Sequence, residues 1–193
     1  MFDINNYFNT SSNLIKSLTK HENEINIIVS KILENHKNGN KILVAGNGGS
    51  CADAEHFAGE LQCTYKNSHR EAISAISIGS MTASLTAWSN DFGFDTYFER
   101  QVKAHGKKND ILFCISTGGG NPENGASMSL VKAAMEAKNK NMFLISLVGK
   151  SGGELKKISD VCIHIDNKIT AFIQESHMSI LHCICEILDE KLV

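Results

Sequence analysis

A histidine and a glutamate lie four residues apart, at His56 and Glu60, within a stretch of helix-forming residues. On a helix this spacing places both side chains one turn apart on the same face. The face then offers an imidazole nitrogen and a carboxylate oxygen to one metal ion. Such pairs are also frequent on solvated helices, so the spacing alone is a weak signal for a metal site.

The C-terminal stretch FIQESHMSILHCICEIL carries polar side chains in an otherwise apolar helical pattern: Gln174, Glu175, His177, His182 and Glu186. Polar groups on a buried helix need partners. At about 100° per residue, His177 lies about 60° round the helix from Gln174 in one direction and His182 about 80° in the other. Both histidines therefore cannot easily join Gln174 at one centre, and the spacing does not choose between them. We interpret His177 as a residue of the core.

Two glycine-rich stretches, GNGGS (46–50) and STGGGNPE (116–123), each follow an apolar run typical of a strand. Glycines allow backbone N–H groups to approach a ligand, and the start of a helix favours negative charge. One such turn is common without a ligand. Two turns at the same edge of a parallel sheet favour binding of a phosphorylated or otherwise anionic small molecule.

The elements that must position these residues follow from the apolar pattern. Residues 21–38 predict an amphipathic helix, residues 3–20 predict a weaker helix before it, and residues 170–192 predict a long final helix. Branched apolar residues predict strands between these helices, with helix-compatible segments separating them: 41–45, 72–78, 110–116, 142–148 and 161–165. This alternation predicts an α/β fold, with one parallel sheet covered by helices on both faces.

Composition narrows the class of protein. The chain has 193 residues, the size of one domain, and a formal net charge of -2, which argues against nucleic-acid binding. No apolar stretch approaches the roughly 20 residues that a membrane span needs, and the N-terminus lacks the pattern of a signal peptide. The six cysteines are scattered among apolar residues without a C-x-x-C motif, which favours buried free thiols. We therefore expect a single-domain cytoplasmic protein.

Together, the motifs resemble those of the phosphoheptose isomerases, bacterial enzymes of the sugar isomerase (SIS) fold. The motifs are GNGGS with DAxHFAxEL, NDFGF with FxRQV, STxG, and IQExH followed by a second histidine. The resemblance extends from about Leu33 to Leu188. It implies a single SIS domain with a five-stranded sheet core at 41–165. It also implies a homotetramer in which the N-terminal helices (1–38) and the C-terminal helix (170–192) form a bundle between subunits that share active sites.

The resemblance also implies a site. Its zinc ligands would be His56, Glu60, Gln174 and His182. Its substrate contacts would be Asn47, Gly48, Gly49, Ser50, Glu60, Asn90, Asp91, Ser116, Thr117, Gly118, Asn121 and Gln174. The implied reaction converts sedoheptulose 7-phosphate into D-glycero-D-manno-heptose 7-phosphate, for lipopolysaccharide or capsule. A proton moves between C1 and C2 through an enediolate, with Glu60 as base, His182 as acid and zinc as the electrophile.

Five positions depart from the family pattern, and each reduces polar or charged contacts: Thr64, Met81, Gly118, Asn121 and Phe172. The phosphate loop loses two hydroxyl groups at Gly118 and Asn121, so a related sugar stays open as substrate. A non-catalytic SIS-fold binding protein, resembling the DnaA initiator-associating protein, is the alternative from another class. All four metal positions are retained, which favours the enzyme, because an interaction module has no need of them.

Overall fold

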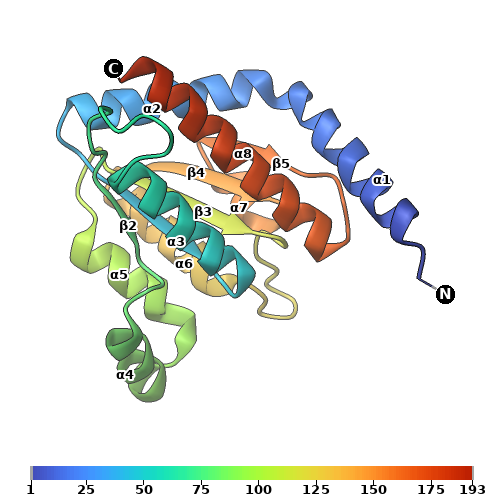
Figure 1. Cartoon of the computed structure of the whole chain (residues 1–193). Coiled ribbons are helices and arrows are strands. Elements are labelled where there is room, and N and C mark those ends of the chain that lie inside the picture. The colour runs from blue at the N-terminus through green and yellow to red at the C-terminus, as the bar shows by residue number, and fades with distance from the viewer. Residues whose placement is uncertain (1, 193) are drawn as a thin grey trace.

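A five-stranded parallel sheet forms the centre of the chain in a computed structural model that describes residues 2–192 (Figure 1). The strands lie in the order β2-β1-β3-β4-β5. Their bounds are β1 Ile42–Gly46, β2 Ala75–Ser77, β3 Ile111–Ser116, β4 Phe143–Val148 and β5 Val161–His164. All neighbouring strands run parallel, so their carboxyl ends meet at one edge. The predicted α/β class is confirmed.

Helices cover both faces of this sheet. Their bounds are α1 Ile4–Lys16, α2 Glu22–Lys37, α3 Gly49–Gln62, α4 Thr82–Phe92, α5 Tyr97–His105, α6 Met128–Asn139, α7 Gly153–Ile158 and α8 Thr170–Lys191. Successive residues of a strand face opposite sides. In β1, Ile42 and Val44 join the core formed with α2, α3 and α8, whereas Leu43 and Ala45 join the core formed with α5, α6 and α7. Burial on both faces explains why the strands are apolar without interruption.

The first predicted helix, residues 3–20, is divided in two. The α1 helix begins after Asp3, whose Oδ1 accepts a hydrogen bond from the Asn6 N–H at 3.0 Å, and ends at Lys16. A 3₁₀ helix, η1 (Ser17–His21), then leads into α2. The α1 helix packs along α8, where the Glu175 carboxylate accepts hydrogen bonds from Tyr7 (2.8 Å) and Ser11 (2.5 Å). The predicted helices at 21–38 and 170–192 are confirmed as α2 and α8.

The second predicted strand, 72–78, was wrong in length, because β2 contains only Ala75–Ser77. Just before the strand, the Ile73 N–H donates to the carbonyl oxygen of Leu61 at 2.9 Å. The chain is thus held by the end of α3 and not by the sheet at this point. Since β2 lies at the edge of the sheet, it has a strand neighbour on one side only.

The α4 helix projects from the body of the molecule at the end opposite α1 and α8 (Figure 1). None of its residues is buried. On the opposite side, α1 exposes large apolar side chains, among them Ile4 (62% exposed) and Phe8 (66%). The rest of the chain leaves these apolar side chains of α1 uncovered.

All six cysteines are free thiols, as expected. The expectation that they are buried was correct for Cys114 and Cys185 but wrong for Cys63 and Cys183, which are exposed. Between residues 2 and 192, no helix is both long enough and apolar enough to cross a membrane.

His177 lies in the core, as the sequence analysis proposed. Its side chain is fully buried on α8, and neither ring nitrogen has a hydrogen-bond partner among residues 2–192. Burial lowers the pKa of His177 to about 4. The Val148 backbone lies close enough to oppose part of this effect, although it does not form a hydrogen bond of normal geometry with the ring. The unfolded chain therefore binds a proton below about pH 6.5 that the folded chain accepts only near pH 4. Stability falls as the pH is lowered through this window.

We predict that His177→Leu removes this part of the pH dependence. The free energy of unfolding of the wild type should drop between pH 7 and pH 4 by about 3 kcal/mol more than that of the variant. Denaturant unfolding at a series of pH values measures the difference. His69→Leu is the control, since His69 is an exposed histidine, and it should keep the pH dependence of the wild type. Equal pH dependence in His177→Leu and wild type would contradict the assignment.

Candidate functional site

The first glycine-rich turn joins β1 to α3 at the carboxyl edge of the sheet. A Cβ at Gly46 would collide with the Ser50 carbonyl oxygen, so only glycine allows this tight turn. Gly48 adopts a positive φ of 56°, and the helix begins at Gly49. Gly48 and Gly49 are exposed, whereas Ser50 is buried. The turn thus presents the start of a helix to solvent, where an anion is favoured.

The second glycine-rich turn follows β3 and is held in shape by hydrogen bonds of its own side chains. The Ser116 hydroxyl accepts a hydrogen bond from the Gly119 N–H at 3.0 Å and donates one to Ser127 Oγ at 3.2 Å. The Asn121 side-chain carbonyl accepts the Glu123 N–H at 2.8 Å. Both polar side chains therefore hold the loop in shape. Gly118 is partly exposed, and no atom outside its chain neighbours lies within 4 Å of where its Cβ would be.

A contact with α7 holds this loop in place. The carbonyl oxygens of Gly119 and Gly120 accept hydrogen bonds from Leu155 N–H (2.8 Å) and Glu154 N–H (3.0 Å). The backbones approach so closely that a Cβ on Gly119 would collide with the Gly152 carbonyl. The shape of the loop thus depends on glycine at this position.

The two turns are connected by Asn47 and Ser129. Asn47 Nδ2 donates to Ser129 Oγ, in the first turn of α6, at 3.3 Å. Ser129 is buried and was not predicted as a site residue. A serine in the first turn of a helix is ordinary, so only its place after the second loop could have indicated it.

The α3 and α8 helices lie side by side and run parallel (Figure 1). Near their first turns, a Cβ on Gly49 would collide with the Gln174 amide. Two turns later, the rings of His56 and His182 lie 5.2 Å apart. The structure thus brings Gln174 to the first loop and His182 to His56. Residues more than 120 positions apart in the sequence therefore meet along the contact between α3 and α8. We call this contact the seam; it contains Gly49, His56, Gln174 and His182. The spacing within either helix could not show it.

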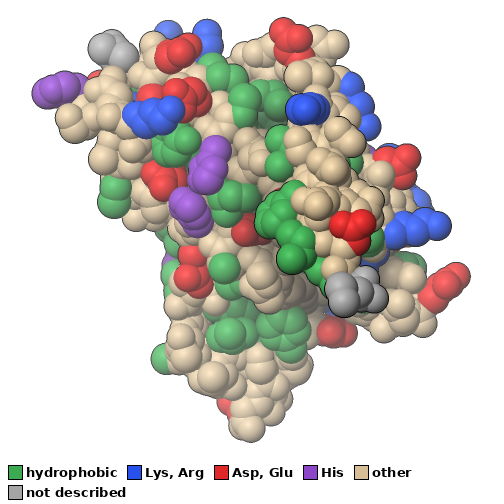
Figure 2. Space-filling view, turned by 45° about the vertical axis from the view of Figure 1, so that its right-hand side comes forward, with side chains coloured by type: hydrophobic (Ala, Val, Ile, Leu, Met, Phe, Trp, Pro, Cys, Tyr) green, Lys and Arg blue, Asp and Glu red, His purple; other side chains and the backbone are tan. Residues whose placement is uncertain are grey.

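His56 and Glu60 contact each other, with Nε2 and Oε1 3.0 Å apart, and their side chains are 45% and 23% exposed. Histidine and acidic side chains gather on one face of the molecule beside apolar ones (Figure 2). Among residues 2–192, however, no three His, Cys, Asp or Glu side chains lie close enough together to hold a metal ion. The seam therefore carries side chains that can bind a metal ion, but these side chains do not converge on one point.

Two further residues at this seam were not predicted. The Tyr65 ring lies 5.8 Å from the His182 ring. On α3, burial raises the pKa of Asp53, an effect that His56 partly opposes. Asp53 Oδ2 has no hydrogen-bond partner in the described part of the chain. The sequence contained no spacing signal for Tyr65, whereas Asp53 lies three residues before His56 and seven before Glu60, on the same face of the helix.

Asn90 and Asp91 lie away from both loops, on the projecting α4 helix. Both are exposed, and Asn90 Nδ2 donates to Asp91 Oδ1 at 2.8 Å. Within the described part of the chain, no hydrogen bond connects either side chain to the glycine-rich turns.

Three of the five departures also lie outside the loops. Phe172 is buried, and its ring packs 4.8 Å from that of Tyr7 on α1. Thr64 Oγ1 donates to the Asn67 carbonyl at 2.9 Å, and the Met81 carbonyl accepts hydrogen bonds at the start of α4. Phe172 therefore contributes to packing between α8 and α1.

Comparison with known proteins gives consistent matches. The sequence matches the SIS domain family over residues 6–149. It is 44% identical to a phosphoheptose isomerase of Campylobacter jejuni, covering 80% of this chain and 79% of that protein. It is 40% identical to one of Helicobacter pylori, covering 91% of this chain and 88% of that protein. Among solved structures, a phosphoheptose isomerase from Francisella tularensis superposes with a TM-score of 0.89 at 33% identity, covering 97% and 96% of the two chains. One from Neisseria gonorrhoeae gives 0.88 at 32%, covering 97% of each.

Two neighbouring glycines of the second loop should respond differently to alanine. Gly119→Ala combines a positive φ of 72° with the collision at Gly152, and should lower the free energy of unfolding by about 2 to 4 kcal/mol. Gly118→Ala meets neither obstacle and should change it by less than about 0.5 kcal/mol. Denaturant unfolding of both variants provides the measurement. A Gly119→Ala variant as stable as Gly118→Ala would show that α7 does not fix the loop.

Proposed function

The chain belongs to the phosphoheptose isomerase family of SIS-domain proteins, and from this premise we propose that it converts sedoheptulose 7-phosphate into D-glycero-D-manno-heptose 7-phosphate. The observation that carries the proposal is the meeting of α3 and α8. It places His182 beside the His56–Glu60 pair and Gln174 beside the first anion-binding turn. We propose that the reaction takes place in the cytoplasm and supplies heptose for lipopolysaccharide or capsule.

The proposed chemistry is a proton transfer between adjacent carbons. Glu60 removes a proton from C1 of the ketose while the carbonyl oxygen on C2 gains a proton from His182, which gives an enediol. Protonation at C2 and loss of the proton from the oxygen on C1 then give the aldose. No atom is gained or lost, so the reaction needs no other reactant. The carboxylate of Glu60 is partly exposed, as a base that must reach substrate requires.

The phosphate of the substrate is held mainly by backbone groups in this proposal. Gly48 and Gly49 at the start of α3 and Thr117 and Gly118 in the second loop supply N–H groups, and α3 supplies its helix dipole. The Ser50 N–H is used within the turn, where it donates to the Asn47 carbonyl at 3.0 Å. The side chains of Ser116 and Asn121 already form hydrogen bonds within the loop. The departures at Gly118 and Asn121 thus remove hydroxyl groups while the backbone cradle stays, which supports a phosphorylated sugar as ligand.

We also propose that His56, Glu60, Gln174 and His182 hold zinc. Imidazole nitrogens and carboxylate or amide oxygens form a donor set that suits this ion. The exposed His56 and partly exposed Glu60 side chains have room to turn toward it. Bound zinc would stabilise negative charge on the sugar oxygens during the proton transfer.

A homotetramer with shared sites completes the proposal. It is supported by the uncovered apolar face of α1 and by the placement of Asn90 and Asp91 on a helix without a buried residue. In an assembly, α4 of one chain can present these two residues to the loops of another. Light scattering that gives the mass of a single chain would contradict this arrangement.

The base assignment is tested by Glu60→Gln. Conversion of sedoheptulose 7-phosphate should slow by about 10²-fold or more, the usual contribution of a positioned acid or base. Glu55→Gln is the matched control, because Glu55 is an exposed glutamate on the same helix, and its rate should stay near that of the wild type. A wild type without aldose product would refute the proposed function. A normal rate in Glu60→Gln would refute only the base.

Metal analysis tests the zinc proposal. Purified protein should contain about one zinc ion per chain, and His56→Ala or His182→Ala should each lower that content clearly. His69→Ala, which replaces an exposed histidine in another part of the chain, should leave the content unchanged. Full zinc content in both His56→Ala and His182→Ala would overturn the proposed ligand set.

A further inference from the structure

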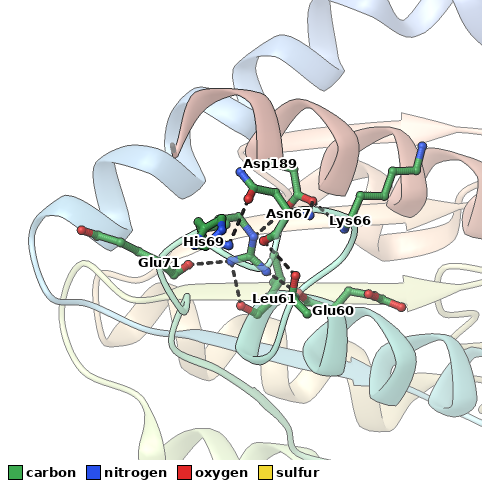
Figure 3. Close-up of polar contacts among 9 residues, drawn as sticks. Glu60, Leu61, Lys66, Asn67, His69, Glu71 and Asp189 are labelled. Atoms are coloured by element: carbon green, nitrogen blue, oxygen red, sulfur yellow. Dashed lines mark hydrogen bonds and ion pairs between the residues drawn. The ribbon is translucent and has the colours of Figure 1, made fainter.

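A buried arginine, Arg70, lies between the end of α3 and α8. Figure 3 shows its partners Asp189, Glu60, Leu61 and Glu71. Its side chain is only 2% exposed, and its guanidinium group makes four hydrogen bonds. Nε donates to Asp189 Oδ1 of α8 at 2.7 Å. The terminal nitrogens donate to the carbonyl oxygens of Glu60 (2.5 Å), Leu61 (3.1 Å) and Glu71 (2.7 Å). One side chain thus joins the end of α3 to α8 and to its own loop.

Two of the three carbonyl groups that Arg70 binds, those of Glu60 and Leu61, belong to the last turn of α3. The final four carbonyls of a helix lack partners within the helix, and a cation is favoured there by the helix dipole. In α3, the Cys63 N–H binds the Gly59 carbonyl at 2.9 Å and the Ile73 N–H binds that of Leu61. Arg70 supplies the partner for Glu60. The backbone of the proposed base is therefore held by a buried charge.

Asp189 holds the same loop from the other side. Its Oδ2 accepts the backbone N–H groups of Lys66 (2.6 Å) and Asn67 (2.8 Å). Burial alone would raise the pKa of Asp189, but these N–H groups and the Arg70 guanidinium outweigh it and hold the pKa below its usual value. The residue before Lys66 is Tyr65, whose ring lies against His182. Asp189 therefore fixes the part of the loop that contacts the proposed acid.

We infer that the Arg70–Asp189 pair is a positioning device for the reaction, since it ties the backbone of Glu60 on α3 to α8 and to the loop whose Tyr65 ring lies against His182. The inference rests on the proposed function. Neither residue touches substrate; both act through the Glu60 backbone and the Tyr65 ring. The role requires the planar fork of arginine, because a lysine has one nitrogen for acceptors that lie in several directions.

The chain contains a matched control pair, Lys41 and Asp110, at the start of the central strand β3. Asp110, with its side chain 1% exposed, accepts Lys41 Nζ at 2.6 Å and the backbone N–H groups of Lys41 (3.0 Å) and Lys107 (2.8 Å). It thus resembles Asp189 in burial, in having a cationic partner and in accepting two backbone N–H groups. It precedes β3, at the amino end of the strand, and has no contact with Arg70 or Asp189.

The experiment compares Asp189→Asn and Arg70→Lys with Asp110→Asn in the full-length protein. We expect kcat for sedoheptulose 7-phosphate to fall by about 10-fold to 100-fold in the first two variants, with KM close to that of the wild type, because small displacements of catalytic groups slow chemistry. Asp110→Asn should lose a similar amount of stability and keep its kcat. Equal kcat values in Asp189→Asn and Asp110→Asn would overturn the inference.

Tyr65→Leu provides a variant that leaves the ion pair intact, in case the charge variants do not fold. Tyr65→Leu should lower kcat without a large loss of stability. Tyr65→Phe, which retains the ring, should keep the kcat of the wild type.

NMR of the histidine ring protons provides a readout that does not need activity. The His182 resonances should shift in Tyr65→Leu and Asp189→Asn and stay in place in Asp110→Asn. Unshifted His182 resonances in Asp189→Asn would overturn the inference even if the wild type proves inactive on this sugar. Such inactivity would refute the proposed function separately.

Discussion

The parallel packing of α8 against α3 is the contact on which the site depends. Each helix alone carries a weak signal, a histidine and a glutamate on one and scattered polar residues on the other. Their alignment places Gln174 at Gly49 and His182 at His56. The apolar core beneath both helices supplies most of the energy for this alignment, since Phe57, Ile173 and Ile180 are buried in one cluster with the strands. Polar side chains can lie between α3 and α8 because the apolar side chains on the other face of each helix are buried against the sheet and hold the two helices together.

The fold could be predicted well from the sequence because its strands are buried on both faces. Runs such as KILVA and DILFCIS are apolar throughout, and the turns that follow them break the pattern sharply. β2 was predicted too long, because the hydrogen bond that removes Ile73 from the sheet comes from the end of a helix. Periodicity left open whether His177 or His182 faces the site, since that depends on how α8 is rotated against its neighbours. Arg70 was not predicted at all. Its partners are carbonyl groups of the preceding helix and a carboxylate 119 residues later, and no local pattern links them.

The second loop shows why missing side chains need not mean a lost binding function. Counting hydroxyl groups in the sequence suggests a weaker grip on phosphate. In the structure, Ser116 is used to shape the loop, and Gly119 and Gly120 are bound by the first N–H groups of α7. The binding surface therefore consists largely of main chain, whose geometry is set by glycines and neighbouring backbone. Side chains such as that of Phe172, which seemed from the sequence to be part of the same loss, serve packing elsewhere.

The α4 helix has a consequence for how this protein can evolve. Its 11 residues include none that is buried, and an isolated helix of this length is marginal in water. Tertiary contacts such as the Trp88 Nε1 hydrogen bond to Thr96 Oγ1, at 2.9 Å, hold it to the following turn. Most substitutions on α4 therefore change the stability of the chain very little. Selection on this helix therefore acts mainly through the molecules that its surface contacts. Its sequence can change to bind other molecules while the sheet and its cores remain unchanged.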